Sequence, residues 1–384
     1  MLIWVMNMKI AFASDAAYPW FNGGMEKRRY LIAKELSKSG HDVHIFTMYR
    51  KGMKGHEFKS EGISYHCCGT ALPDSKMYKN GRRNMIWPLK YALALPFKLF
   101  RYRFDFVDTD AFPFLHIPAL RFYSRLRRVP LVCTWHEVWS KEYWRAYAGL
   151  FAGAAGYFIE KSAMDKIKRR ITNSLATMED ATKLFGIPKD EMALLYSAVS
   201  EEEIEKAASK MRGKVEDRFT IVGRAIPEKR LDMAMRLISY IESRLTVVTS
   251  RNAITELENA AKSLGVAKKV RFESGLSNEK LFGIIAKSKA LLMLSKREGL
   301  SLNTIEALAI GTPVIAMDTT MLPEEVKRYC VVIKEDSIKE GIRDFIKNYR
   351  RYKLKAMNNS STVIREFGSR AAHRAYKTVL EREV

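Results

Sequence analysis

The stretch KREGLSLNTIEALAIGTPVIAM (296–317) joins a polar loop, a helical segment and a buried strand. It places two carboxylates, Glu298 and Glu306, on either side of a helix start expected near Leu302 or Asn303. The free N–H groups and the dipole of a helix start attract anions. A carboxylate repels phosphate but accepts two hydrogen bonds well, and neighbouring sugar hydroxyls offer two donors. The stretch therefore predicts two hydroxyl-binding glutamates beside an anion cradle.

A purely structural role is the alternative for these charges. Glutamate near a helix start is favoured by the dipole by about 0.3 to 1 kcal/mol, which would be enough to explain Glu306. Arg224 and Lys229 could likewise be solvated surface charges. Their common position at strand ends of one expected sheet favours a functional site.

The quoted stretch lies in a series of strand-like runs alternating with helical patterns, which is typical of a parallel sheet with helices. The runs are FTIVG (219–223), LTVVTS (245–250), VRFE (270–273), ALLMLS (290–295), TPVIAM (312–317) and CVVI (330–333). In open sheets of this kind ligands bind beyond the carboxyl ends of the strands. After the first run comes RAIPEKR, where Gly223 permits close backbone approach and Arg224 and Lys229 would suit a diphosphate.

The first half of the chain repeats this organisation. MKIAFAS reads as a strand, a loop and a helical pattern from Met25 to Lys38 follow, and HDVHIFT reads as the next strand. Further strand-like runs are ISYHC (63–67), FDFVD (104–108) and VPLVCTW (129–135). We expect a parallel sheet covered on both faces.

The length of 384 residues favours two domains. The charged stretch from about 197 to 217 reads as their junction. We expect a first α/β domain over 1–200 and a second over 201–367. The amphipathic helix 368–384 is expected to pack back on the first domain.

Composition narrows the range of partners and compartments. The formal net charge of +23 points to phosphate-bearing partners, whether nucleic acid, anionic lipid or a phosphorylated small molecule. The cysteines show neither zinc-ligand spacing nor a disulfide framework, so a reducing cytoplasm fits best. The four are Cys67, Cys68, Cys133 and Cys330.

Two motifs carry a family resemblance. EGLSLNTIEALAIGTPVIA resembles the E-x7-E signature of glycosyltransferase family 4, and IVGRAIPEKR resembles the Gly-Arg…Glu-Lys segment of that family. The resemblance implies the GT-B architecture, in which two Rossmann-like domains with parallel sheets face a central cleft. It also implies transfer of a sugar from a nucleotide-sugar donor with retention of anomeric configuration.

The resemblance also implies roles for residues of the second domain. Glu306 would bind the hydroxyls of the donor ribose, Glu298 would bind those of the transferred sugar, and Arg224 and Lys229 would stabilise the departing diphosphate. Gly223, Gly299 and the backbone of Leu300, Ser301 and Leu302 would complete the donor site. The chain departs from the family where Leu300-Ser301 replaces the common Phe-Gly pair and Ser197-Ala198-Val199 replaces Asn-Gly-Val.

In the first domain, Gly23 and Gly24 resemble the glycine loop of the family that approaches the donor phosphate and acceptor. His136, just beyond an expected buried strand, resembles the histidine of the family that contacts the transferred sugar. Asp108-Thr109-Asp110 spells the DxD triplet that binds Mn²⁺ or Mg²⁺ in a different glycosyltransferase architecture. Because Arg224 and Lys229 already supply positive charge, we expect no metal and no other cofactor.

Two further stretches raise the question of membrane contact. Residues 76–103 interleave Lys and Arg with Trp87, Phe97, Phe100 and Tyr102, which suits either a helix in an anionic membrane interface or an ordinary domain helix with snorkelling lysines. Residues 146–159 are apolar but too short to span a bilayer. Lipid-linked acceptors are common in the resembled family.

The expected function is therefore a retaining hexosyltransferase. It would use a UDP- or GDP-sugar and a hydroxyl acceptor, such as a lipid-linked glycan, in the cytoplasm or at the cytoplasmic face of a membrane. A nucleotide-sugar epimerase would share the architecture without needing an acceptor. A basic nucleic-acid-binding protein would need neither glutamate, and no nucleic-acid-binding motif is recognised.

Overall fold

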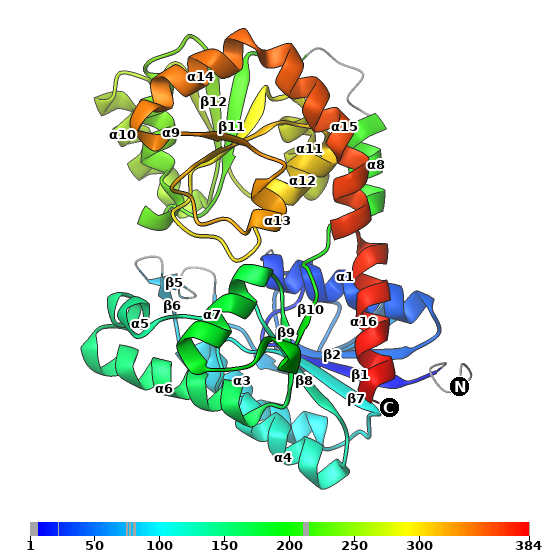
Figure 1. The fold of residues 1–384 in the computed structure, drawn as a ribbon. Helices are drawn as coiled ribbons and strands as arrows, with labels where there is room; N and C mark the ends of the chain where they lie inside the picture. Colours follow the sequence, from blue (N-terminus) through cyan, green and yellow to red (C-terminus); the bar gives the residue numbers. More distant parts are fainter. Residues whose placement is uncertain are drawn as a thin grey trace. The chain divides into compact units, whose positions relative to one another are not determined.

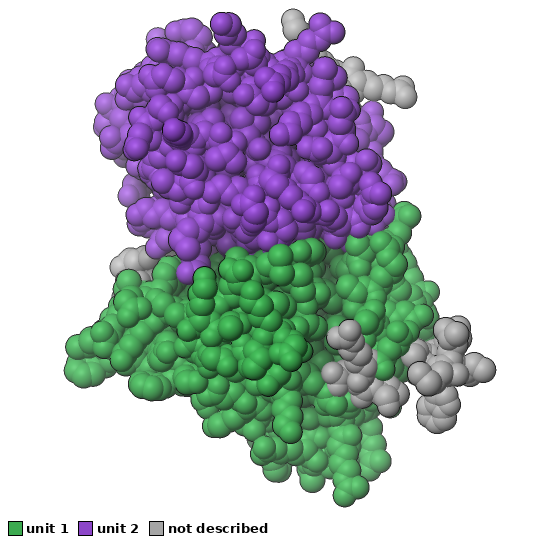
Figure 2. Space-filling model, in the orientation of Figure 1, with its two compact units in different colours: residues 1–198, 369–384 green, residues 199–368 purple. Residues whose placement is uncertain are grey.

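The chain folds into two compact units, coloured separately in Figure 2. Unit 1 comprises residues 1–198 and 369–384, and unit 2 comprises residues 199–368. The computed structural model describes residues 7–21, 23–73, 76, 78–79, 82–209 and 215–383. Parts of the expected membrane-facing stretch and of the expected junction lie outside the described residues.

Unit 1 contains an eight-stranded sheet in the order β10-β9-β8-β7-β1-β2-β4-β3. Its strands are β1 (Lys9–Ala13), β2 (Asp42–Tyr49), β3 (Glu57–Ser60), β4 (Ile63–Thr70), β7 (Phe106–Asp110), β8 (Leu131–Trp135), β9 (Arg169–Thr172) and β10 (Met192–Leu194), and β5 (Tyr78–Lys79) and β6 (Arg82–Arg83) form a separate two-stranded ribbon. Every pairing in the large sheet is parallel except that of the edge strand β3 with β4. The expected parallel sheet is confirmed, with one antiparallel edge that the sequence pattern did not indicate.

The helices of unit 1 are α1 (Gly24–Lys38), α3 (Ile86–Leu99), α4 (Ile117–Arg127), α5 (Lys141–Ala148), α6 (Leu150–Lys166), α7 (Leu175–Phe185) and α16 (Ser369–Glu383). The expectation of a single helix over 76–103 was wrong, because the short strands β5 and β6 interrupt the described part of that stretch before α3 begins at Ile86. The apolar stretch 146–159 is divided between α5 and α6. Gly149, with a φ of +88°, breaks the helix there.

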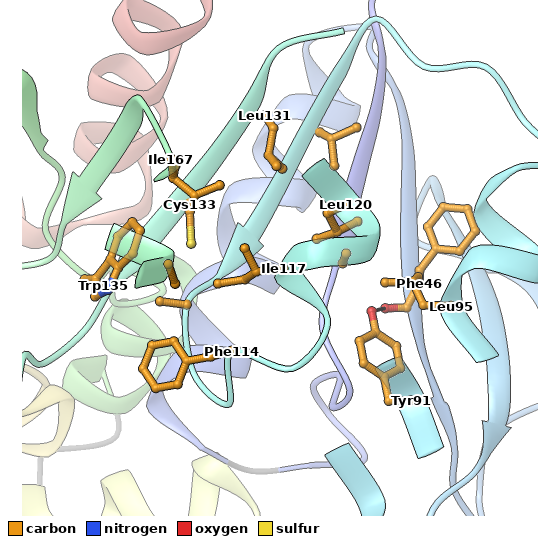
Figure 3. Packing of buried hydrophobic residues seen from close by; sticks show 14 of the residues in the cluster. Phe46, Tyr91, Leu95, Phe114, Ile117, Leu120, Leu131, Cys133, Trp135 and Ile167 are labelled. Carbon is orange, nitrogen blue, oxygen red and sulfur yellow. Dashed lines mark hydrogen bonds between the residues drawn. The ribbon is translucent and has the colours of Figure 1, made fainter. Parts of the chain in front are cut away.

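Strands and helices alternate along unit 1, so helices cover both faces of its sheet and bury them. On one face, Leu131 and Cys133 of β8 lie beside Ile117 and Leu120 of α4, while Tyr91 and Leu95 of α3 lie beside Phe46 of β2 (Figure 3). Val132, between Leu131 and Cys133, belongs to the apolar cluster on the other face. The hydroxyl of Tyr91 on α3 also donates to the Phe46 carbonyl, at 3.0 Å. Helix α3 is thereby hydrogen-bonded directly to β2.

Helix α16, the last of the chain, belongs to the core of unit 1. It runs beside α1 (Figure 1). Ala372, Tyr376 and Leu380 are buried in the same cluster as Ile10 and Phe12 of β1. The unit boundaries after residues 198 and 368 lie within two residues of those expected from the sequence.

Unit 2 contains a six-stranded sheet in the order β13-β12-β11-β14-β15-β16, with every pairing parallel. The strands are β11 (Arg218–Val222), β12 (Arg244–Val248), β13 (Val270–Glu273), β14 (Ala290–Met293), β15 (Val314–Met317) and β16 (Val331–Ile333). The helices are α8 (Glu201–Ser209), α9 (Leu231–Ile238), α10 (Ile254–Ser263), α11 (Asn278–Lys287), α12 (Leu302–Ile310), α13 (Glu324–Lys327), α14 (Ile338–Lys347) and α15 (Tyr349–Phe367). All six expected strands are confirmed. Much of the stretch read as a junction is instead α8, the first helix of unit 2.

Candidate functional site

The strand order of unit 2 reverses between β11 and β14, its two central strands. From β11 the chain moves outward to β12 and β13 and then returns to the other side of β11 to form β14, β15 and β16. The loops after β11 and β14 therefore leave the sheet in opposite directions and open a crevice, which is where ligands bind in such sheets. These two loops contain most of the predicted site residues.

The loop after β11 begins at Gly223 and ends in a 3-10 turn over Pro227–Lys229. The N–H of Gly223 donates to the Val248 carbonyl at 3.0 Å and so continues the ladder with β12. A β-carbon at Gly223 would lie 3.4 Å from the Cβ and Cγ of Lys229, so the absence of a side chain lets the lysine lie close to the backbone. Arg224, next along, is exposed.

Lys229 and Glu298, from the two loops, meet directly. The Lys229 Nζ lies 2.5 Å from the Glu298 Oε1, and the two side chains are 22% and 11% exposed. Two backbone hydrogen bonds fix the loop after β14. The N–H of Lys296 donates to the Glu228 carbonyl at 2.8 Å, and the N–H of Glu298 donates to the Met321 carbonyl at 3.0 Å. The structure thus brings a predicted phosphate-binding cation and a predicted sugar-binding carboxylate together as an ion pair.

Helix α12 begins at Leu302, where the sequence placed it. The residue before it, Ser301, has a φ of +64°, and Leu300 is buried. No acidic residue lies in the first turn, so the N–H groups there keep their attraction for an anion. Positive φ favours glycine, which explains physically why Phe-Gly is common in the resembled family at Leu300-Ser301.

Glu306 lies on α12 and is only 3% exposed, so it is not a solvated surface residue. A buried carboxylate needs hydrogen-bond donors or a positive charge to offset its lost hydration. The far end of α12 is held by Lys353, whose Nζ donates to the Gly311 carbonyl at 2.8 Å. The helix that positions Glu306 is therefore anchored at its carboxyl end.

The strand order of unit 1 reverses between β7 and β1. The loop after β1 leads to Gly23 and Gly24, with Gly23 as the N-cap of α1. A β-carbon on Gly23 would collide with the Glu26 carboxylate, which therefore lies against the N-terminus of α1. The predicted glycine loop therefore lies at the switch point of unit 1, and the Glu26 carboxylate lies where the loop joins α1.

His136 follows β8, the neighbour of β7. Its Nε2 lies 2.7 Å from the Oδ1 of Asp110, and Arg29 pairs with the other carboxylate oxygen. Burial, reinforced by the positive charges of Arg28 and Arg29, lowers the pKa of His136 to about 3. His136 is therefore neutral near pH 7, and because its partner is a carboxylate, Nε2 carries the proton and donates it.

Asp110 belongs to the site of unit 1, although its sequence context indicates only a DxD triplet. It accepts from His136 and pairs with Arg29, and it is 3% exposed. The signal was the appearance of two aspartates directly after the apolar residues that begin β7, a strand that is buried throughout, unlike a solvated DxD loop. Among the described residues, no group of three or more His, Cys, Asp or Glu is arranged to hold a metal ion.

The predicted residues thus form two groups. Gly223, Arg224, Lys229, Glu298 and Glu306, with the 299–302 backbone, lie at the switch point of unit 2. Gly23 and His136, on loops, and Gly24, the first residue of α1, lie beside the switch point of unit 1. The first group combines cations, a helix start and carboxylates, which together suit an anion bearing hydroxyls.

Comparison with known proteins places the two units in families. Residues 22–203 match the family described as Glycosyltransferase Family 4, and residues 202–361 match the family described as Glycosyl transferases group 1. A mannosyltransferase of Mycolicibacterium hassiacum, named MMP alpha-(1->4)-mannosyltransferase, is 25% identical over 211 residues, which cover 51% of this chain and 50% of that protein. The chain spans about half the length of the first curated relatives it matches.

Solved structures share the fold at low sequence identity. A sucrose-phosphate synthase from Thermosynechococcus elongatus is 15% identical, with a TM-score of 0.79 over 98% of this chain and 99% of that chain. The Anabaena protein HepE, solved in complex with UDP, is 14% identical, with a TM-score of 0.72 over 98% of this chain and the whole of that chain.

The two family matches join at residues 202–203, close to the boundary between the units, and together they extend from residue 22 to residue 361. The E-x7-E spacing, the switch-point position of its glutamates and the all-parallel sheet of unit 2 agree with that assignment. The chain belongs to the glycosyltransferases of the family 4 type, with the GT-B fold.

Proposed function

We propose that this protein is a retaining glycosyltransferase that moves a hexose from a UDP- or GDP-sugar to a hydroxyl acceptor. The observation that carries the proposal is the Lys229–Glu298 pair at the switch point of unit 2, beside the start of α12. A cation, free helix N–H groups and a carboxylate match the diphosphate and the sugar hydroxyls of one donor molecule. The names of the matched families and the UDP complex of HepE support the choice of donor class.

The proposed reaction has no covalent enzyme intermediate. The acceptor oxygen bonds to the anomeric carbon on the face from which the diphosphate oxygen leaves, and the acceptor proton passes to a phosphate oxygen of the leaving group. The products are a glycoside of unchanged anomeric configuration and a nucleoside diphosphate. Lys229, Arg224 and the α12 N-terminus stabilise the departing charge, which is electrostatic catalysis.

The remaining roles follow the family resemblance. Glu306 binds the ribose hydroxyls, and Glu298 binds hydroxyls of the transferred sugar once the donor has drawn Lys229 toward its diphosphate. In unit 1, neutral His136 binds the transferred sugar. Its Nε2–H donates to Asp110, so its Nδ1 can accept a hydrogen bond from a sugar hydroxyl.

We propose further that catalysis needs no metal. Both aspartates of the DxD triplet are engaged by other side chains, Asp108 by Tyr376 and Asp110 by His136 and Arg29. In unit 2, Lys229 and Arg224 supply the charge that Mg²⁺ would otherwise provide. Treatment with EDTA should leave turnover unchanged, and restoration of lost turnover by Mn²⁺ would overturn the proposal.

The proposed acceptor is a lipid-linked glycan at the cytoplasmic face of a membrane. No helix in the described part of the chain is both long and apolar enough to cross a bilayer. The supporting feature is instead a surface of α3 and α4, where Leu93, Phe97, Phe122 and Leu126 are between 60% and 81% exposed. Neither helix contains an acidic residue, and the two carry five basic ones, so the surface is apolar and positively charged. Trp87, in contrast, is buried and faces the core.

Sedimentation with liposomes tests the membrane part of the proposal. The protein should sediment with anionic vesicles, and less so as salt rises, because the surface charges are screened. The pair Leu93→Ser and Phe97→Ser should weaken sedimentation, whereas Leu354→Ser, at an exposed leucine of α15 in unit 2, should not. Equal sedimentation of all variants, or none at any salt concentration, would contradict the α3–α4 surface.

Nucleotide release tests the reaction itself. The protein is incubated with a panel of UDP- and GDP-sugars, with and without a polyprenyl-phosphate-linked glycan. A transferase releases nucleoside diphosphate faster when the acceptor is present. An epimerase converts the donor sugar with no net release, and a nucleic-acid-binding protein does neither.

A further inference from the structure

Unit 1 contains a buried group of four charges on neighbouring elements. Strand β7 presents Asp108 and Asp110 on the same face, because they are two residues apart, and each is 3% exposed. Helix α1 supplies Arg28 and Arg29, which are 2% and 3% exposed. Buried charges are costly unless they are paired, so the pairing of these four decides how the site around them is held.

The outer half of this group holds the predicted site. Arg29 pairs with Asp110, and its Nη1 also donates to the Ala16 carbonyl at 3.0 Å, in the loop that leads to Gly23. Asp110 accepts from His136. Arg29 and Asp110 therefore connect the loop after β1 with the residue after β8.

The inner half depends on the last helix of the chain. The hydroxyl of Tyr376 on α16 donates to the Asp108 Oδ2 at 2.6 Å. Burial raises the pKa of Asp108, and the nearby Arg28 and the Tyr376 hydrogen bond oppose that rise. Because burial raises the pKa of Tyr376 well above 10, the phenol keeps its proton and remains a donor.

Arg28 has little compensation other than the charge of Asp108. Its Nη1 donates to the Thr134 hydroxyl at a long 3.5 Å. Its Nε and Nη2 have no hydrogen-bond partner among the described residues. If Asp108 took up a proton, Arg28 would be left as an uncompensated buried charge. The next carboxylate on the same face of β7 is Asp110, so Arg28 would then be attracted toward Asp110.

We propose that Tyr376 is a positioning residue for His136. By stabilising ionised Asp108, it preserves a negative charge near Arg28 and leaves Asp110 to Arg29 and His136. The last helix of the chain thereby helps to fix the tautomer of a residue beside the switch point of unit 1. The kinetic part of this inference rests on the proposed transferase function, whereas the structural part does not.

Simple packing is the competing explanation for Tyr376. Its ring lies 6.0 Å from that of Phe12 and 6.2 Å from that of Phe106, measured between centroids. Tyr376→Phe keeps the ring and removes only the hydroxyl, so it separates the two explanations. Leu380→Ala damages the same apolar cluster without touching Asp108 and is the matched control.

The experiment measures the His136 tautomer by side-chain ¹H–¹⁵N NMR in the full-length protein, together with kcat and donor KM. Wild type should show the Nε2–H form. Tyr376→Phe should lose the dominance of that form and lower kcat by about tenfold, the factor expected for one hydrogen bond to a charged group, with little change in donor KM. Leu380→Ala should keep the tautomer.

A rescue variant completes the test. If Tyr376→Phe acts by releasing Arg28 toward Asp110, adding Arg28→Met should restore the Nε2–H form. An unchanged tautomer in Tyr376→Phe, an equal change in Leu380→Ala, or no rescue in the double variant would each overturn the inference. Should Tyr376→Phe alone not fold, the double variant still tests it, because the Nε2–H form is expected there. If wild type transfers no sugar, the proposed function fails while the tautomer still decides the positioning role.

Discussion

At the scale of single residues, the ion pair of Lys229 and Glu298 has a consequence for donor binding. The Lys229 Nζ and the Glu298 Oε1 lie 2.5 Å apart, so each compensates the charge of the other. Under the proposed function, a donor diphosphate would offer Lys229 a stronger counter-charge and would free Glu298 to accept hydrogen bonds from sugar hydroxyls. The pair therefore keeps two charges compensated until a ligand with both chemical features arrives.

Replacing Lys229 by Ala should lower kcat about 10²- to 10³-fold, because a preorganised charge at the departing diphosphate is lost. Steady-state kinetics of nucleotide release would measure this. Lys262→Ala, at an exposed lysine of α10, is the control and should behave as wild type. Wild-type turnover in Lys229→Ala would remove Lys229 from the mechanism.

The two glutamates should give different kinetic phenotypes. Glu306→Gln should mainly weaken donor binding and raise the donor KM, because the ribose is remote from the reacting bond. Glu298→Gln should mainly lower kcat, because it acts on the sugar that is transferred. Calorimetric titration with UDP, beside the kinetics, separates the two effects. Identical profiles for both variants would contradict the assigned ends of the donor.

His136 should make stability depend on pH. Its pKa is about 3 in the folded protein, below the 6.5 of an unperturbed histidine, so between these values the unfolded chain binds a proton that the native state does not. Stability should therefore fall as pH falls from 6.5 towards 3, by up to about 1.4 kcal/mol per pH unit from this group.

Urea unfolding across that pH range would measure the slope. His136→Gln should give a shallower slope than wild type, while buried His66, with a pKa of about 4, contributes to both proteins. A slope that the substitution leaves unchanged would show that His136 is not held neutral.

The sequence predicts the carboxylates and cations of the candidate site but not the residues that support them. The motifs name residues close together along the chain, such as Glu298 and Glu306. Arg29, Asp110 and Tyr376 meet only through tertiary packing, and Tyr376 lies 268 positions from Asp108. Without homologous sequences, no local pattern could have connected them.

At the scale of elements, the turn into α12 contains a strained backbone position. Ser301 adopts a φ of +64°, and its hydroxyl lies 2.9 Å from that of Thr304. Ser301→Gly should stay within about 1 kcal/mol of wild-type stability, because relief of strain offsets the lost contact and the freer unfolded chain. Ser301→Val should cost about 2 kcal/mol, because a β-branched residue tolerates positive φ poorly.

Thermal unfolding of both variants checks this prediction. Donor KM should rise in Ser301→Val as the loop shifts, and remain near wild type in Ser301→Gly. Equal stability of the two variants would argue against strain at this turn.

Elements were predicted well where their pattern is strong and less well at edges. All six strands of unit 2 follow from apolar runs bounded by helical patterns. The edge strand β3 (Glu57–Ser60) is half exposed and charged, and β10 is three residues long, so neither gives a clear signal. The helix expected over 76–103 was overextended because basic and aromatic residues continue on both sides of α3.

At the scale of the whole molecule, the chain forms two units, each with a parallel-stranded switch point bordered by candidate site residues. The family matches divide at nearly the same place as the units. Family and fold could be predicted from the sequence because the decisive motifs are local. The donor base, the sugar and the acceptor depend on contacts that the motifs do not specify.

The anomeric configuration of the product tests the central claim most directly. A nucleotide-sugar that supports acceptor-dependent nucleotide release is identified, and the initial product is examined by ¹H NMR. The account predicts a glycoside with the anomeric configuration of the donor, formed by wild type and nearly absent with Lys229→Ala. An inverted product, or a donor consumed without transfer to any acceptor, would contradict it.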